Sequence, residues 1–442
     1  MKAALTRHIT LALILLITLI FAKLQANKLS GGEDEVCTTI CSDGRGYYAW
    51  LPGIFIYHDL NFNFFDGVEA KDSLCGGPVG GCMQDYRVYH DGAACNKYYP
   101  GASFMMLPFF AAAHFITTTF THYAPSGYSY PYFRLAGVSG IFYYMMGMLF
   151  FLAILVKMGL DTTQRAITIL LVTFGTNIMY FAVDKPTYSH IYSFTLIAAF
   201  IYLLQCLRER YSARQVLLLS FITGWIFIAR PVNLSILVIV PFIFRGQVRN
   251  ILNEVKLKPA RLALLLPGFI MPALLLGLYK ISVGRFFVYS YGGESFDFLH
   301  PHFWQFLFSG TNGVFAYMPL LLMPFLLLPV WYTPAVRNYV AGAAVTLLFT
   351  CYIHSSWYCW WYGFSFGART ILDVAPLFGL VIGLSLRGAD RKRYVVLLPA
   401  YLVATVLTVL LYHQKTHGYL NGFPINDYWD AIGNAIGLST KI

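Results

Sequence analysis

The chain has 442 residues and a net charge of +11, and 58% of its residues are apolar whereas only 12% are charged. A soluble globule of this length needs far more polar surface, so the composition excludes one and favours a protein whose solvent is the bilayer. The surplus of Lys and Arg is explained by the loops of a membrane protein, so no nucleic-acid partner is needed.

Apolar segments long enough to cross about 30 Å of hydrocarbon recur along the chain. We predict an all-α, polytopic fold in which residues 1–442 form one integral membrane domain with about eleven spanning helices. The expected spans are 9–25, 132–156, 165–183, 188–207, 214–230, 232–245, 261–282, 317–333, 338–354, 370–387 and 393–412. The first could instead be a cleaved signal peptide, which would leave the loop after it unchanged.

Basic residues predict the orientation, because cytoplasmic loops collect Lys and Arg. Clusters around Arg208, Arg245 and Arg387 are therefore placed inside. Since two spans already join an inner Lys2 to an inner Lys157, the further apolar stretch 100–121 is expected to dip into the outer leaflet without crossing. The segments placed on the extracytoplasmic side are a large first loop (26–99), a second loop (283–316), a third loop (355–369) and the tail 413–442.

Cysteine usage agrees with this orientation. Six cysteines fall in the segments placed outside: Cys37, Cys41, Cys75, Cys82, Cys95 and Cys359. An even number in an oxidising compartment predicts up to three disulfides, and metal ligation is the alternative, which the spacings do not favour. A bacterial inner membrane with the functional side facing the periplasm fits these features.

The outer loops are unusually aromatic. Residues 47–57 (YYAWLPGIFIY) are too short to span and too apolar for water, so we expect an interfacial helix with Tyr and Trp at headgroup level. The second and third loops have the same character, and the third places several aromatic residues around Trp360. Together the three loops predict one composite pocket at the outer interface.

Asp43 is the candidate catalytic residue. It lies in a glycine-flanked turn, CSDGRG, and a carboxylate at the outer interface can accept a proton from an attacking hydroxyl. The alternative is an Asp that only bonds its own backbone, as Asp-Gly turns often do. Spacing alone favours the turn role, so the catalytic role rests on the other features of the chain.

Cationic residues form a second candidate set. Arg230 interrupts an apolar run where two helices meet, and its planar fork suits a phosphate, although it could also extend to lipid headgroups. Lys97, Lys185, His190 and Arg369 are expected at the same side, where each could equally be a solvated charge. Glu294 offers a second acidic group that could help a divalent cation. The chain has neither a nucleotide phosphate loop nor a two-histidine zinc motif.

These short motifs resemble the GT-C class of polytopic glycosyltransferases, in particular members with a mannosyltransferase-like or aminoarabinose-transferase-like plan. The resemblance rests on Asp43 followed by Tyr47 and Tyr48, and on the motifs KYYPG, SHIYSF, ARPVN and YGFSFGARTILDVAP. It implies a polyprenyl-phosphate sugar as donor, Asp43 as general base, and Lys97, Arg230 and Arg369 at the lipid-linked phosphate. The position of Asp43 after two cysteines departs from the usual pattern of the class.

The expected activity is therefore inverting transfer of a sugar to an acceptor hydroxyl of a lipid, glycan or protein. Lys97, Lys185, His190, Arg230 and Arg369 would bind the donor, and Tyr47, Tyr48, Tyr99, Glu294 and Trp360 would line the substrate pocket. The sequence indicates no particular cofactor, and a divalent cation, Mg²⁺ or Mn²⁺, is compatible with the acidic groups. The alternatives are a surface polysaccharide polymerase or ligase that uses lipid-diphosphate oligosaccharides, and a lipid-sugar flippase or transporter, which usually shows internal repeats.

Overall fold

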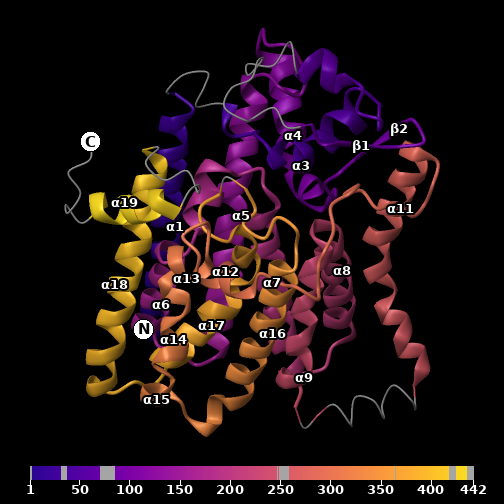
Figure 1. Ribbon diagram of the computed structural model, residues 1–442. Coiled ribbons are helices and arrows are strands. Elements are labelled where there is room, and N and C mark those ends of the chain that lie inside the picture. Colours follow the sequence, from indigo (N-terminus) through magenta and orange to yellow (C-terminus); the bar gives the residue numbers. More distant parts are fainter. Residues whose placement is uncertain are drawn as a thin grey trace.

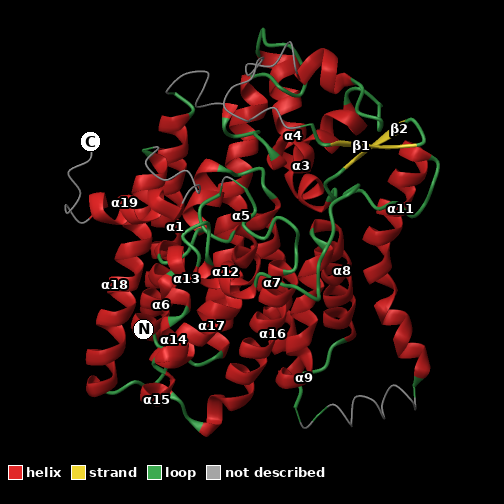
Figure 2. Cartoon of the chain, viewed as in Figure 1, coloured by secondary structure: helices red, strands yellow, loops and turns green. Residues whose placement is uncertain are grey.

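The computed structural model describes residues 2–30, 37–69, 85–245, 247, 258–363, 365–417 and 425–435. This part of the chain is almost entirely helical. Figure 2 shows that its strands form a single antiparallel hairpin, in which β1 (Arg87–His90) pairs with β2 (Ala93–Asn96).

Helices fill the chain from end to end. Up to residue 229 they are α1 (Lys2–Lys28), α3 (Asp43–Phe55), η1 (Phe65–Glu69), α4 (Gly101–Phe120), α5 (Tyr130–Lys157), α6 (Thr162–Phe174), η2 (Tyr180–Asp184), α7 (Ser189–Glu209) and α8 (Ala213–Ala229). Beyond that they are η3 (Pro231–Ile239), α9 (Val240–Ile243), η4 (Pro259–Phe269), α11 (Ile270–Val283), α12 (Phe303–Phe308), α13 (Val314–Tyr317), η5 (Pro319–Leu321), α14 (Met323–Leu326), α15 (Leu328–Trp331), η6 (Pro334–Val336), α16 (Arg337–Ser355), η7 (Arg369–Val374), α17 (Ala375–Leu386), α18 (Arg391–Thr416) and α19 (Ile425–Ala435).

Eight helices in the described part of the chain are long and apolar enough to cross a membrane. They are His8–Lys28, Gly101–Phe120, Tyr130–Lys157, Ser189–Glu209, Pro259–Val283, Pro334–Ser355, Arg369–Leu386 and Arg391–Thr416. The shorter apolar helices Ala213–Ala229 and Pro231–Ile243 lie between them. The prediction of an all-α polytopic membrane protein is confirmed at this level.

Two expected spans are not continuous helices. Residues 165–183 form α6 and then the separate segment η2, with Gly175 ending the first helix. Residues 317–333 form a series of short pieces, because Pro319, Pro324 and Pro329 recur every five residues. A proline lacks the N–H of the helix ladder and clashes with the preceding turn, so each one starts a new piece.

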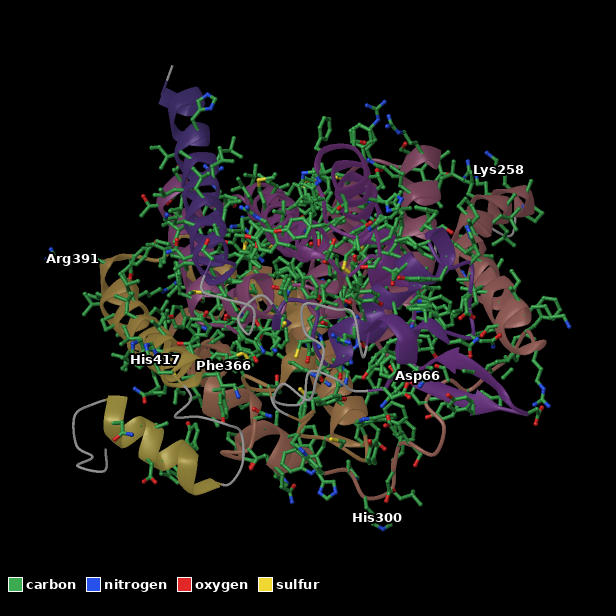
Figure 3. The ribbon with its side chains drawn as sticks, turned by 90° about the horizontal axis from the view of Figure 1, so that it is seen from above. Asp66, Lys258, His300, Phe366, Arg391 and His417 are labelled. Atoms are coloured by element: carbon green, nitrogen blue, oxygen red, sulfur yellow. The ribbon has the colours of Figure 1, made fainter. Side chains whose placement is uncertain are left out.

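The helices stand roughly side by side and define two ends of a bundle (Figure 1). α3, α4, the hairpin and α19 gather at the end drawn uppermost in Figure 1, which we call the upper end. α9 and α15 lie towards the lower end. Figure 3 views the bundle from its upper end, and Lys258 before η4 and Arg391 at the start of α18 mark opposite sides of the bundle in this view.

Helix α4 packs against the first half of α5. The Tyr143 hydroxyl donates to the Met105 carbonyl near the start of α4, and His114, further along α4, meets the hydroxyl of Tyr132 at the start of α5. The two helices therefore run antiparallel, and α4 ends beyond the point where α5 begins. Because α4 is also long and apolar enough to cross a membrane, the expectation that it dips into one leaflet without crossing stays a prediction.

Helices α7 and α17 lie at the centre of the bundle. Every residue of α17 is buried, as is the run from Ser189 to Ile201 in α7. A helix that is apolar on all sides is stable only where protein or lipid surrounds it, and here the neighbouring helices do so. The upper ends of these two helices therefore have a rigid setting.

The expected interfacial helix at residues 47–57 is corrected. A helix does form, α3, but its residues from Gly44 to Gly53 are buried inside the protein. Trp50 is fully buried and donates its indole N–H to the Tyr98 carbonyl at 2.8 Å. Its aromatic residues thus fill the interior of the upper end, where α4 and the hairpin cover them, instead of facing lipid headgroups.

The cysteine prediction is corrected in part. Cys95 and Cys359 are free thiols, so the six outer cysteines do not form three pairs. Cys37 and Cys41 are disulfide-bonded, whereas Cys75 and Cys82 lie outside the described residues. The pairing therefore stays a prediction.

Candidate functional site

A cavity of about 750 Å³ opens among the upper ends of the helices. Its walls come from all three aromatic loops and from the starts of α7, η3 and η7. The ionisable lining residues, apart from the tyrosines and cysteines, are Asp43, Lys97, Lys185, His190, Arg230, Glu294, His354 and Arg369. The aromatic ones are Tyr47, Tyr98, Tyr99, Tyr188, Tyr289, Tyr291, Phe296, Trp357, Tyr358 and Tyr362.

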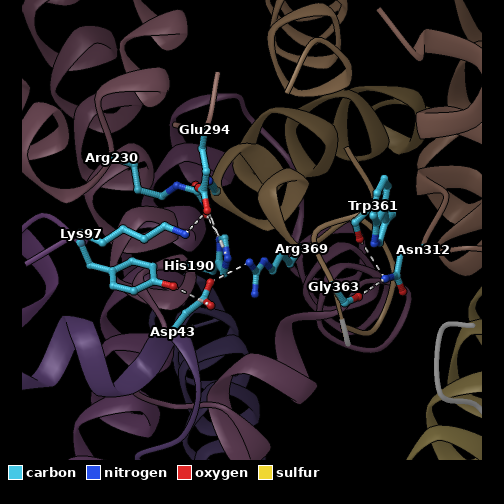
Figure 4. Close-up of polar contacts among 11 residues, drawn as sticks. Asp43, Lys97, His190, Arg230, Glu294, Asn312, Trp361, Gly363 and Arg369 are labelled. Carbon is cyan, nitrogen blue, oxygen red and sulfur yellow. Dashed lines mark hydrogen bonds and ion pairs between the residues drawn. The ribbon is translucent and has the colours of Figure 1, made fainter. Parts of the chain in front are cut away.

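Asp43, the first residue of α3, is held from two sides (Figure 4). Its Oδ2 lies 2.6 Å from Nη2 of Arg369, and its Oδ1 accepts a hydrogen bond of 2.9 Å from the Tyr98 hydroxyl. The Arg369 guanidinium is itself stacked near the rings of Tyr188 and Tyr362. This carboxylate is thus a built part of the cavity wall and not a solvated turn residue.

The charge of Asp43 is stabilised by its neighbours. Burial alone would raise the pKa of this carboxyl, but the Arg369 guanidinium, the Tyr98 hydroxyl and the Lys97 ammonium together hold the pKa below its usual value. Asp43 is therefore deprotonated at neutral pH, as a general base must be. A bound substrate that draws Arg369 away would make the same carboxylate more basic.

Arg230, which ends α8, meets two residues of other elements. Its Nη1 lies 2.8 Å from Nδ1 and 3.3 Å from Nε2 of His190, and 3.4 Å from Oδ2 of Asp373. Asp373 in turn lies 2.8 Å from Nδ1 of His190. The Arg230 side chain remains 14% exposed and lines the cavity, whereas the Asp373 side chain behind it has no exposed surface.

Lys97 joins the first and second loops. Its ammonium donates to the Glu294 carboxylate and lies 5.6 Å from the centre of the Tyr291 ring. Tyr291 packs edge-on against Trp357 of the third loop, and the two ring centres are 5.5 Å apart. This contact chain connects all three loops on one side of the cavity.

Lys185 is the lining cation with no hydrogen-bond or ion-pair partner for its side chain among the described residues. It is half-buried, and burial lowers the pKa of its ammonium to about 8. The other lysines and arginines of the cavity wall each face a carboxylate. The Lys185 ammonium is therefore available to form an ion pair with an anionic group in the cavity.

Close backbone contacts bring these residues together. Gly101 at the start of α4 touches the end of α8, where an added Cβ would lie 2.4 Å from the Ala229 nitrogen. The Trp225 indole donates to the Gly101 carbonyl across the same contact. Because α4 approaches α8 so closely, Lys97 and Arg230 face one cavity.

The third loop is fastened by Asn312. Its side-chain amide donates to the carbonyls of Trp361 and Gly363 at 2.9 and 2.7 Å, as Figure 4 shows. Asn312 and Tyr362 both have positive φ angles, 59° and 56°, a conformation that is uncommon for residues other than glycine. The two hydrogen bonds keep this loop in place beside Arg369.

An apolar groove of about 420 Å³ adjoins the cavity. The two share Pro231, Val232 and Phe296 in their linings. The remaining lining residues of the groove are Leu234, Ser235, Phe298, Phe349 and Ile353, which belong to η3, α16 and the second loop. The groove therefore leads from the charged cavity along two helices of the bundle.

Nine of the predicted site residues line the cavity: Asp43, Tyr47, Lys97, Tyr99, Lys185, His190, Arg230, Glu294 and Arg369. Tyr48 and Trp360 are corrected, since neither lines it. Tyr48 is buried in α3, where its hydroxyl donates to the Gly127 carbonyl at 2.8 Å. Trp360 points to His302 instead, and its neighbour Trp357 takes the place in the wall.

Sequence reasoning missed Asp373, His354 and the tyrosines at positions 98, 188, 291 and 362. Asp373 had a usable signal, because it is a charge inside the apolar segment ILDVAP, and such charges in membrane helices are usually functional. The tyrosines had none, since 32 tyrosines are spread along the chain. Only the folded arrangement singles these four out.

Among the described residues, no group of three or more His, Cys, Asp or Glu side chains is arranged to hold a metal ion. A divalent cation therefore stays a prediction for this cavity. If one is used, Glu294 and Asp43 are the lining carboxylates that could contribute oxygen ligands.

The helices and the cavity together define a polytopic helical membrane protein with a charged, aromatic-walled site at one end of its bundle. No family model, curated protein or solved structure matches the chain.

Proposed function

We propose that this protein is a membrane glycosyltransferase of GT-C-like plan, with about eleven crossings. It transfers a sugar from a polyprenyl-phosphate donor to an acceptor hydroxyl. We place the upper end of the bundle on the extracytoplasmic side, in a bacterial inner membrane facing the periplasm. The alternating runs of the helices and the basic residues near the lower end support this placement.

The observation that carries the proposal is that a charged cavity and an apolar groove share part of their lining. A cavity lined by two carboxylates and several cations adjoins an apolar groove, and the two share Pro231 and Val232. A ligand that fills both must combine a charged or polar head with a long apolar tail. A lipid-linked sugar phosphate has this build, and Arg230 stands next to Pro231, where its phosphate would lie.

The chemistry follows from the lining residues. Asp43 takes the proton from the acceptor hydroxyl, and the oxygen attacks the anomeric carbon as the bond to the phosphate oxygen breaks. The electron pair of that bond stays on the departing polyprenyl phosphate, whose charge Arg230 and the other cations stabilise. A single displacement inverts the anomeric configuration.

The aromatic wall supports a sugar as the transferred group. Tyr291 and Trp357 offer ring faces and edges, and Glu294 and Lys97 offer an acceptor and a donor for hydroxyl groups. Pockets of this kind combine apolar area with a few placed polar groups, which together fix the orientation of the ligand.

The test is an assay of the purified protein in lipid nanodiscs with a panel of polyprenyl-monophosphate sugars. We expect release of polyprenyl phosphate together with a glycosylated product of inverted configuration. Asp43→Asn should lower the rate by about 10²- to 10⁴-fold, the range for loss of a general base. Asp91→Asn is the matched control, since this exposed carboxylate of the same loop pairs with the exposed Arg285 and does not line the cavity.

The same assay separates the alternatives. Turnover of polyprenyl-diphosphate oligosaccharides, and not of monophosphates, would favour a polymerase or ligase. Movement of the lipid-linked sugar between leaflets without any bond cleavage would favour a flippase. Full activity in the Asp43→Asn variant would overturn the assignment of the base.

A further inference from the structure

Asp373 lies behind the cavity wall and not in it. It is the fifth residue of η7, its side chain has no exposed surface, and it is absent from the cavity lining. An ionised carboxylate buried in this way is expensive unless it is paired and hydrogen-bonded. Its partners therefore indicate what it is for.

Both partners of Asp373 belong to the wall. Oδ1 lies 2.8 Å from Nδ1 of His190, and Oδ2 lies 3.4 Å from Nη1 of Arg230. Because the carboxylate accepts, the ring proton is assigned to Nδ1, and Nη1 of Arg230 lies against the same ring, 2.8 Å from Nδ1 and 3.3 Å from Nε2. One carboxylate thus fixes the ring and the guanidinium against each other.

These three residues come from different elements. Asp373 belongs to η7, His190 to α7, and Arg230 ends α8. Arg230 carries a long side chain with several rotatable bonds, and an arginine that is not held loses much of its geometric advantage as a phosphate ligand. The buried carboxylate of Asp373, on η7, restricts the conformations that the Arg230 side chain can adopt.

We propose that Asp373 is a positioning residue that holds Arg230 and His190 in the orientation that receives the phosphate of the lipid-linked substrate. The inference rests on the proposed function, because it names the partner of that phosphate. Asp373 itself touches neither the cavity nor the ligand. It acts through the fork of Arg230, whose cavity side remains exposed.

The direction in which Asp373→Asn changes the affinity for a phosphate separates a positioning role from a purely electrostatic one. A buried negative charge near a phosphate repels it, so removal of the charge alone should strengthen binding of an anion. Loss of a positioning partner should instead weaken binding, because Arg230 would have to be ordered at the moment of association. The two roles therefore predict opposite effects of Asp373→Asn.

The experiment measures binding of undecaprenyl phosphate to the full-length protein in nanodiscs, with inorganic phosphate as a second probe. We expect Asp373→Asn to weaken binding of the lipid about tenfold, which corresponds to about 1.4 kcal/mol. Asp373→Glu, which keeps the charge but moves it, should bind with intermediate affinity and also serves if the Asn variant does not fold. Equal or tighter binding by both variants would overturn the proposal.

A double variant tests whether the effect passes through Arg230. Asp373→Asn combined with Arg230→Ala should bind no more weakly than Arg230→Ala alone, whereas losses that add would show that the residues act independently. Asp161→Ala is the control for general destabilisation. It removes the capping box of α6, which begins next to the end of α5 opposite the cavity, and should leave the affinity unchanged.

The outcomes also separate this inference from the proposed function. Binding of undecaprenyl phosphate without any sugar transfer by the wild-type protein would contradict the enzyme, while the affinities of the variants still decide the role of Asp373. Transfer by the wild type with unchanged binding in the variants would contradict the inference alone. A wild-type protein that does not bind the lipid would contradict both.

Discussion

Asp43 and Arg369 form an ion pair between the start of α3 and the start of η7, with Oδ2 and Nη2 2.6 Å apart and both side chains about 15% exposed or less. The same short segment, η7, carries Asp373, whose carboxylate faces Arg230. The segment η7 therefore supplies Arg369 as the partner of Asp43, the candidate base. It also supplies Asp373 as the partner of Arg230, the candidate phosphate-binding residue.

The pH profile of the transfer reaction should depend on this ion pair. The pKa of Asp43 is held below its usual value of 3.8, so the wild-type rate should stay level through mildly acidic pH and fall only near that low pKa. In Arg369→Gln the largest opposing charge is gone and burial raises the pKa of Asp43. Since only the deprotonated carboxylate accepts a proton, the acidic limb should move to higher pH.

The measurement is kcat/KM from about pH 3 to pH 9, a range that begins below the ordinary carboxyl pKa and ends above the ordinary histidine pKa. Arg285→Gln is the control, because this exposed arginine pairs with Asp91 and neither residue lines the cavity. An acidic limb at the same pH in Arg369→Gln and wild type would show that Asp43 does not control the rate.

A small change in α3 should disturb the hydrogen bond to Asp43. A Cβ on Gly46 would lie 2.1 Å from Cδ2 of Tyr98, so Gly46→Ala must push the Tyr98 ring away. A hydrogen bond to a charged group contributes about 1.5–3 kcal/mol, so we expect a rate loss of about ten- to a hundredfold, similar to Tyr98→Phe.

Gly67→Ala is the matched control for this change. A Cβ at Gly67 would meet nothing within 4 Å, and the residue lies in the same loop. We expect its rate to equal that of the wild type. A Gly46→Ala protein that retained full activity would show that the Tyr98 hydroxyl is not needed to hold the carboxylate.

The Lys97–Glu294 ion pair should stabilise the folded protein by holding the first and second loops together. The two side chains are 15% and 23% exposed, so removing one partner leaves a largely desolvated charge. Lys97→Met and Glu294→Gln should each lower the free energy of unfolding by about 1 kcal/mol, and the double variant should lose less than the sum. Thermal unfolding in detergent measures all three.

The Asp91–Arg285 pair provides the comparison, since it is 71% and 61% exposed. Exposed ion pairs contribute little, so the same cycle there should give no measurable coupling. Equal coupling in both cycles would contradict the view that burial makes the Lys97–Glu294 pair important.

The apolar groove should recognise the length of the lipid tail. Leu234 lines the groove but not the cavity, and Leu234→Trp should narrow the groove without touching the charged residues. We expect a higher KM for an undecaprenyl donor, by about tenfold, and little change for a short farnesyl analogue that does not fill the groove. Steady-state kinetics with the two donors measure the difference.

Leu348→Trp is the control on α16, because this leucine is 58% exposed and next to the groove residue Phe349. It should leave both KM values unchanged. Equal KM changes for the long and the short donor in Leu234→Trp would show that the tail lies elsewhere.

The amino-acid sequence determined the membrane class, most of the spans and nine of the lining residues. Spanning helices are local: a run of about twenty apolar residues needs the bilayer whatever the rest of the chain does. Asp43, Arg230 and Arg369 were visible for a related reason, since a charge or a carboxylate at the edge of an apolar run is itself a local signal.

The pairing of these charges was decided only by the tertiary structure. Asp43 pairs with Arg369, and Arg230 pairs with Asp373, because helices from distant parts of the chain pack with their ends at the same height in the bundle. No local sequence pattern determines this alignment of the helix ends. The same packing buries Tyr48 and turns Trp360 away from the cavity while it brings Trp357 into the wall. Local hydropathy predicts which residues are buried. The contacts of these buried residues, however, depend on the close packing of the whole bundle.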